Sequence, residues 1–134
     1  MDCIFCKIVA GEIPAFKVYE DDDILAFLDI TPVNSGHTLV IPKQHYASLL
    51  ELPDELLCRL AQAVKKIAPA VLAGVNSDGF NLGLNNGPVS GQLVPHFHWH
   101  IMPRFDGDGF ELWHGHKYAD GEAEAVATEI KKNL

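Results

Sequence analysis

Three histidines alternate with three large apolar residues in one short segment of the chain. They are His96, His98 and His100, with Phe97, Trp99 and Ile101 between and after them. Alternation is the period of a half-buried β-strand, so we expect all three imidazoles on one face and the apolar side chains in a core behind them. Neighbouring histidines would then lie about 7 Å apart, too far for all three to reach one zinc ion at about 2.0–2.1 Å. The spacing favours a middle imidazole that acts on a substrate while its neighbours supply hydrogen bonds and positive charge.

Length and charge limit the class of protein. The 134 residues are enough for one domain with a hydrophobic core, and we expect a single domain over residues 1–134. A formal net charge of −8 disfavours long nucleic acids as partners, although a local site can still bind a single nucleotide. The first residues lack the basic and apolar regions of a secretory signal, and no apolar run approaches the roughly 20 residues of a membrane span. These features predict a cytoplasmic protein with no membrane partner.

Cys3 and Cys6 form a CxxC pair near the start of the sequence. A redox pair normally follows a strand and begins a helix, and no strand is predicted before this pair. Two thiolates can also supply half of a zinc site, with distant histidines as the other two ligands. Both residues can equally be small buried apolar side chains. The odd total of three cysteines argues against a disulfide framework. Of the three interpretations, zinc binding is the one that we favour.

Apolar periodicity and turn residues predict a mixture of strands and helices. The expected strands are Phe16–Tyr19, Ile24–Leu28, His37–Pro42 and Phe80–Leu84, in addition to the histidine segment. The first two should form a hairpin around an acidic turn. A long helix is predicted from about Asp54 to about Val75, with Pro69 expected to kink or divide it. Its apolar stripe comprises Leu56, Leu57, Leu60, Ala61, Val64, Ile67, Ala68, Val71, Leu72 and Val75.

Three shorter segments complete the predicted elements. Ser48–Glu51 has the spacing of a capping box and predicts a short helical turn. Glu122–Asn133 predicts a terminal helix of alanine and charged residues. The segment from Asn85 to Gln92 is rich in glycine and amide side chains, which offer N–H groups to an anion. Because it lies immediately before the histidine segment, we interpret it as a candidate phosphate-binding loop.

The segment His96–Met102 matches the histidine triad motif, in which three histidines alternate with apolar residues and two further apolar residues follow. Further segments resemble the same family in the family's order: Cys3–Ile8, Leu25–Ile30, Gly36–Lys43, Asn85–Gly87 and Gly91–Gln92. On these residues the chain is identified as a member of the histidine triad (HIT) family, similar to its zinc-bearing bacterial branch. The resemblance implies an α+β fold with a five-stranded antiparallel sheet and one long helix. It also implies a homodimer whose two sheets join into one of ten strands.

The resemblance also implies an activity and its residues. Family members hydrolyse or transfer nucleotides at the α-phosphate, with His98 matching the nucleophile, His100 the donor to the phosphoryl oxygens and His37 their polar partner. The positions that match nucleotide contacts, besides His98 and His100, are Phe27, Asp29, Ile30, Asn85, Gly91 and Gln92. The positions that match the structural zinc ligands are Cys3, Cys6, His45 and His96. No catalytic metal is expected, and the implied ligand is a purine mononucleotide or nucleotide conjugate.

Two features leave the substrate open. Many family members carry Ser or Thr where this chain has Leu93, which cannot donate a proton to the leaving group. The choice between nucleoside phosphoramidates and dinucleoside polyphosphates is also expected to depend on the segment around Trp113, in the last thirty residues, which match the family least well. The alternative from another class is a nucleotide-binding or scaffold protein with little turnover, which would use the same pocket.

Overall fold

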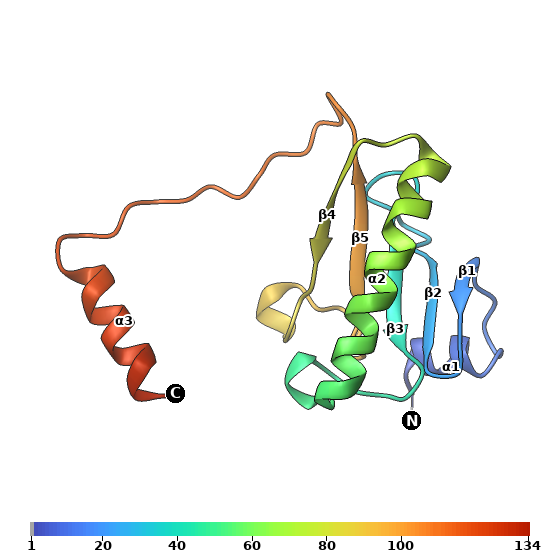
Figure 1. The fold of residues 1–134 in the computed structure, drawn as a ribbon, viewed down its shortest axis with the longest axis horizontal. Coiled ribbons are helices and arrows are strands. Elements are labelled where there is room, and N and C mark those ends of the chain that lie inside the picture. Colours follow the sequence, from blue (N-terminus) through green and yellow to red (C-terminus); the bar gives the residue numbers. More distant parts are fainter. Residues whose placement is uncertain (1) are drawn as a thin grey trace.

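A five-stranded antiparallel sheet forms the body of the protein. The computed structural model describes residues 2–134, and its strand order is β1-β2-β3-β5-β4 (Figure 1). The strands are β1 (Lys17–Glu20), β2 (Ile24–Leu28), β3 (Thr38–Pro42), β4 (Gly79–Gly83) and β5 (Trp99–Arg104). The predicted hairpin is present, because β1 pairs antiparallel with β2, and the expected strands lie within one residue of these bounds apart from the histidine segment. The predicted α+β class is therefore confirmed.

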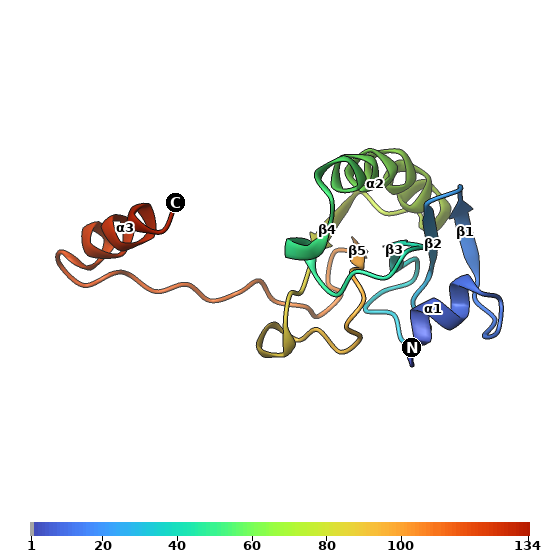
Figure 2. The same ribbon diagram turned by 90° about the horizontal axis from the view of Figure 1, so that it is seen from below.

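The two faces of the sheet are covered by different helices. The long helix α2 (Asp54–Val75) crosses one face, and the short α1 (Ile4–Val9) lies against the other (Figure 2). One core therefore joins α2 to Ala26, Val40 and Ile101, and the second joins α1 to neighbouring positions such as Leu25 and Leu39. Because both faces are covered, β3 is buried along its whole length. Successive side chains of the central strands thus enter opposite cores.

The helix α2 has the predicted bounds but departs from the prediction in two details. Pro69 does not divide it, because the helix runs unbroken and Pro69 lies on its exposed side, where water can satisfy a freed carbonyl. Ala61 is exposed and Ala63 is buried in its place. The buried stripe consequently follows the three- and four-residue spacing of one helix face. Asn76 ends the helix in the left-handed conformation, with φ of 58°.

The predicted capping box is wrong, although a short helical turn forms at the expected place. The 3₁₀ turn η1 spans Leu49–Glu51, and the Ser48 side chain makes no capping hydrogen bond. The Glu51 carboxylate instead accepts a hydrogen bond of 2.8 Å from the backbone N–H of Ala47. The backbone N–H of Leu49, the first residue of the turn, donates to Asn86 Oδ1 at 2.8 Å.

The histidine segment is only partly a strand, which corrects the prediction of one continuous strand. β5 begins at Trp99, so His96 and His98 precede it and only His100 lies within it. One local and one long-range bond explain the late start: the backbone N–H of His96 donates to Val94 O, and the backbone N–H of Phe97 donates to Tyr46 O. The alternation of faces survives, because Phe97 and Ile101 are buried in the core under α2 while the imidazoles gather on the other face.

The C-terminal part leaves the sheet as an extended arm. Residues 105–121 carry the chain away from the body to α3 (Glu122–Lys132), which lies apart from the sheet (Figures 1 and 2). The structure buries none of its residues, and Val126 and Ile130 leave an apolar stripe exposed. Of the helices in residues 2–134, none combines the length and apolar character that crossing a bilayer requires.

Candidate functional site

The four predicted zinc ligands meet beneath the N-terminal helix. Cys3 Sγ lies 3.5 Å from His96 Nδ1, and Cys6 Sγ lies 3.4 Å from His45 Nδ1 and 3.6 Å from His96 Nδ1. All four ligand atoms lie within 4.8 Å of one another. Cys3 and His96 are 93 positions apart in the sequence, and they meet because α1 packs on the sheet face on which the imidazoles gather.

This geometry fits a closed tetrahedral zinc site. Bonds of about 2.3 Å to sulfur and 2.0–2.1 Å to nitrogen place sulfur and nitrogen ligands about 3.6 Å apart around the ion. His96 Nε2 donates a hydrogen bond of 2.8 Å to Pro42 O, so the neutral ring has its lone pair on Nδ1, the atom that faces the cysteines. The four residues would hold the ion with no open position for a substrate, and the cluster is consistent with structural zinc.

His98 presents an unprotonated nitrogen. Its Nδ1 donates a hydrogen bond of 2.6 Å to His96 O, which places the single proton of the neutral ring on Nδ1. Burial lowers the pKa of His98 below its ordinary value, so the ring is neutral at pH 7. No hydrogen bond within residues 2–134 uses its Nε2. That lone pair is therefore available to an electrophile.

His37 and His100 form a directed chain of hydrogen bonds. The backbone N–H of Val33 donates to His37 Nδ1 at 3.0 Å, so the proton of neutral His37 must lie on Nε2. His37 Nε2 lies 2.9 Å from His100 Nδ1 and donates to it. The proton of neutral His100 consequently lies on Nε2. One backbone amide thus determines the tautomers of two imidazoles.

The N–H of His100 at Nε2 has no protein partner. Within residues 2–134 it is the one buried side-chain nitrogen or oxygen that lacks a hydrogen bond. Buried donors without a partner are rare in folded proteins, and no group of the described residues competes for this N–H, which is free to donate to a molecule in the adjoining cavity. Burial, together with His98 and His37 nearby, lowers the pKa of His100 to about 4. His100 is therefore a neutral donor at pH 7.

Asp29, His37 and His100 also lie close enough to suggest a second metal site, since their ligand atoms lie within 4.8 Å of one another. The tautomers argue against it. The lone pair of His37 is occupied by the N–H of Val33, and its other nitrogen carries a proton that a metal would have to displace. We therefore interpret this cluster as a hydrogen-bond chain, with Asp29 Oδ2 3.8 Å from His37 Nε2.

A cavity of about 270 Å³ opens beside these imidazoles. It is lined by six of the residues that are predicted to react or to bind nucleotide: Phe27, Asp29, Ile30, Gly91, His98 and His100. Apolar side chains of α1 form another wall, and Leu93, which is 92% exposed, lies at the cavity as well. Asp29 can accept from a ligand through Oδ2, because Oδ1 already accepts from the backbone N–H and the hydroxyl of Thr31. The composition, apolar with a few polar groups, is typical of small-molecule sites.

The remaining predicted residues lie elsewhere. Asn85 and His37 line a neighbouring cavity of about 500 Å³, which His100 and Trp113 of the arm also border. Gln92 lines neither cavity. Its amide is held by two backbone groups: Oε1 accepts from Gly87 N at 2.8 Å, and Nε2 donates to Ala47 O at 2.6 Å. In this structure Gln92 closes the loop.

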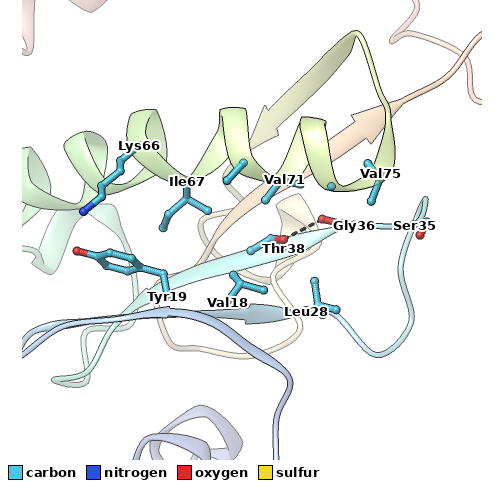
Figure 3. Close-up of a pocket in the computed structure, with 12 residues that line it drawn as sticks. Val18, Tyr19, Leu28, Ser35, Gly36, Thr38, Lys66, Ile67, Val71 and Val75 are labelled. Carbon is cyan, nitrogen blue, oxygen red and sulfur yellow. Dashed lines mark hydrogen bonds between the residues drawn. The ribbon is translucent and has the colours of Figure 1, made fainter.

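A third cavity, of about 400 Å³, lies between α2 and the strands on the opposite face from the imidazoles (Figure 3). Figure 3 shows mainly aliphatic side chains around it, with Lys66 and Tyr19 at one end. None of the twelve described residues that line it is a histidine, cysteine or carboxylate. Its polar side chains are those of Tyr19, Ser35, Thr38 and Lys66, and it holds none of the residues predicted to react or to bind nucleotide or zinc.

Two contributors to the site were not predicted from the sequence. The backbone N–H of Val33 carries no side-chain signal, and only the fold shows that it reaches His37. Phe5 lies between the two cysteines, where its apolar character suggested only packing, yet its ring contacts those of His96 and His98. The CxxC spacing could have drawn attention to the two residues between the cysteines. The side on which the Phe5 side chain lies, however, depends on the formation of the helix α1.

Comparison with known proteins identifies the family of this chain. Residues 10–107 match the HIT domain family, and the chain belongs to that family. The crystal structure of a HIT family member from Bacillus subtilis is 47% identical, covers 100% of this chain and 98% of its own, and superposes with a TM-score of 0.90. The adenosine 5′-monophosphoramidase hnt1 of Schizosaccharomyces pombe is 40% identical over 136 residues, which are 100% of this chain and 99% of that protein.

A further relative bears on the metal cluster. The crystal structure of a zinc-bound histidine triad family protein from Mycobacterium smegmatis is 36% identical to this chain. It covers 100% of this chain and 99% of its own, with a TM-score of 0.78. The Cys₂His₂ cluster described above is thus found in a fold for which a zinc-bound structure exists.

Proposed function

We propose that the protein hydrolyses or transfers nucleotides at the α-phosphate of purine nucleotide conjugates, with His98 as nucleophile. One observation carries this proposal: His98 and His100 border the same cavity in opposite tautomers. His98 offers a lone pair at Nε2, and His100 offers an unpartnered N–H at Nε2. A phosphoryl group needs both, an attacking atom for phosphorus and a donor for the oxygens that gain charge.

The reaction follows from these two nitrogens. His98 Nε2 forms a bond to the α-phosphorus while the bond from phosphorus to the leaving group breaks, and the electron pair of that bond departs with the leaving group. The resulting nucleotidyl-imidazole retains its proton on Nδ1, where His96 O accepts it. Water then attacks phosphorus, the P–N bond breaks and the lone pair returns to Nε2. The proton lost by water is released to solvent, from which the departed leaving group is protonated. Splitting one displacement into two steps is the advantage of covalent catalysis.

His100 and the chain behind it stabilise the charge on the phosphoryl oxygens. Val33, His37 and His100 form a line of donors that ends at the cavity, and a preoriented donor needs no reorganisation during the reaction. Gly91, with φ of 93°, brings the loop backbone to the same cavity. No catalytic metal is part of this proposal.

The nucleoside lies at the other end of the cavity. Phe27 and Ile30 supply apolar contact for a base, and the free Oδ2 of Asp29 accepts from ribose hydroxyls. The name of the Schizosaccharomyces pombe relative, adenosine 5′-monophosphoramidase, supports a nucleoside phosphoramidate as substrate. Dinucleoside polyphosphates are the second substrate type to test. Because Leu93 cannot donate a proton, conjugates with good leaving groups should react faster.

We also propose that the protein is a homodimer. β4 is an edge strand with Phe80 and Leu82 partly exposed, and an open apolar edge is suited to pairing with a second copy. The expected mass in light scattering at micromolar concentration is twice the 14.7 kDa of one chain. A mass of one chain over the whole concentration range would contradict the proposal.

The test of the activity is a turnover assay with both substrate types. His98→Ala should lower kcat by at least about 10³-fold, the scale seen when a catalytic nucleophile is removed. The matched control is His116→Ala, an exposed histidine of the arm, which should retain wild-type turnover. Near-normal turnover in His98→Ala would refute the role of His98. A wild-type protein that binds nucleotide conjugates and leaves them uncleaved would instead favour the binding or scaffold alternative.

A further inference from the structure

Phe5 connects the metal cluster to the proposed nucleophile. It lies on α1 between Cys3 and Cys6 and is only 7% exposed. Its ring meets the imidazoles of His96 and His98 edge to face, with centroid distances of 5.8 and 5.1 Å and interplanar angles of 72° and 86°. It also meets Phe27 at 5.5 Å. One side chain therefore contacts a predicted zinc ligand, the proposed nucleophile and the base pocket.

A second connection runs through His96. Its Nδ1 faces the two cysteines, and its backbone oxygen accepts the proton of His98 Nδ1 at 2.6 Å. The ring of His96 is fixed on the other side by its bond to Pro42 O. Whatever holds the His96 ring consequently also limits movement of the carbonyl that determines the tautomer of His98.

The helix that carries Phe5 depends on the cluster. α1 has six residues, far fewer than an isolated helix needs to be stable in water. Its N-cap is Cys3, whose sulfur accepts from the backbone N–H of Cys6. The two cysteines thus provide both the cap of the helix and its link to the histidines.

We infer that the Cys₂His₂ cluster, through Phe5 and His96, positions the His98 ring for reaction, with Phe5 as a positioning residue. This inference rests on the proposed function of His98. A structural zinc ion held by Cys3, Cys6, His45 and His96 then affects turnover as well as stability. The His37–His100 chain is anchored to Val33 on a separate loop and does not depend on the cluster.

The experiment compares the wild type, the wild type treated with a chelator, and Phe5→Leu, each with histidine labelled with nitrogen-15. Metal analysis gives zinc per chain, and NMR follows the His98 Nδ1 proton with the His37 Nε2 proton as internal reference. Phe5→Leu should keep its zinc, weaken or lose the His98 signal and lower kcat by about twofold to tenfold, the scale of an aromatic edge contact. The control Ile67→Val trims the core under α2, and it should change neither signal nor kcat.

The outcomes separate the inference from simpler explanations. Chelation should abolish the His98 signal while the His37 signal persists. If chelation unfolds the chain, both signals vanish and Phe5→Leu, which retains zinc, decides the matter. A Phe5→Leu protein that is less stable but has wild-type kcat and an intact His98 signal would overturn the inference. If the wild type shows no turnover, the proposed function fails, while the NMR comparison still tests the positioning of His98.

Discussion

The half-buried imidazole of His100 makes the stability of this protein depend on pH. Burial, followed by the neighbouring His98 and His37, lowers its pKa from 6.5 to about 4. The folded state therefore binds this proton less readily than the unfolded chain. As pH falls below 6.5, the unfolded chain takes up the proton first, and the free energy of unfolding decreases until about pH 4.

The magnitude follows from the two pKa values. Lowering a pKa from 6.5 to about 4 corresponds to about 3 kcal/mol when the whole interval has been crossed. At pH 5 most unfolded chains carry the proton and most folded chains do not, so about 2 kcal/mol of stability relative to pH 8 is lost through His100. This is a large fraction of the stability of a small domain.

The measurement is urea unfolding of the wild type and of His100→Gln at pH 8 and pH 5, with zinc content determined in parallel. Both proteins retain the other six histidines and all cysteines, so titration at the metal cluster contributes to both. The wild type should lose about 2 kcal/mol more than the variant between the two pH values. Equal losses in the two proteins would show that His100 is readily protonated in the folded state, and the argument for a neutral donor would fail.

Three further perturbations test the fold around the site. Gly36→Ala should destabilise by at least about 2 kcal/mol in urea unfolding, because φ is +91° and a Cβ would lie 2.7 Å from a methyl of α2. Its control, Gly74→Ala, meets no atom within 4 Å in an exposed helical position and should be neutral or stabilising. Cys6→Ser should lower bound zinc well below one per chain, with a lower urea midpoint; unchanged metal content would count against the cluster. The Arg104 side chain lowers the pKa of the Asp108 carboxyl. Asp108→Asn should therefore reduce the melting temperature at pH 7, and the melting temperature of the variant should fall less than that of the wild type when the pH is made acidic.

Much of the fold could be predicted because its signals are local. The bounds of α2 follow from apolar periodicity and from the turn at Asn76, and both lie within the helix or next to it. The hairpin follows from two apolar runs around an acidic turn. The errors occurred where tertiary contacts competed with local rules. Pro69 is tolerated because it faces solvent, and the strand predicted through the histidines starts late because the N–H of Phe97 bonds to Tyr46 O.

The candidate site was predictable by residue type and less so by position. The alternation of histidines with apolar residues correctly placed the imidazoles together on one face. The spacing of the three histidines did not show that they have different partners. His96 lies against the cysteines, whereas His100 is hydrogen-bonded to His37. The amide of Gln92 is held by backbone groups, and a glycine-rich loop read in isolation does not show which of its polar groups are occupied.

The amino-acid sequence by itself determined the inventory of this protein: a long amphipathic helix, a set of short apolar strands, a CxxC pair and three alternating histidines. These are consequences of composition and periodicity over a few residues. Only the tertiary structure decided which nitrogen of each imidazole carries a proton. Each tautomer depends on a backbone group brought close by folding: Val33 N–H for His37, Pro42 O for His96, and His96 O for His98. The sequence cannot show which of the two ring nitrogens carries the proton, because the hydrogen-bond partner of the ring determines it.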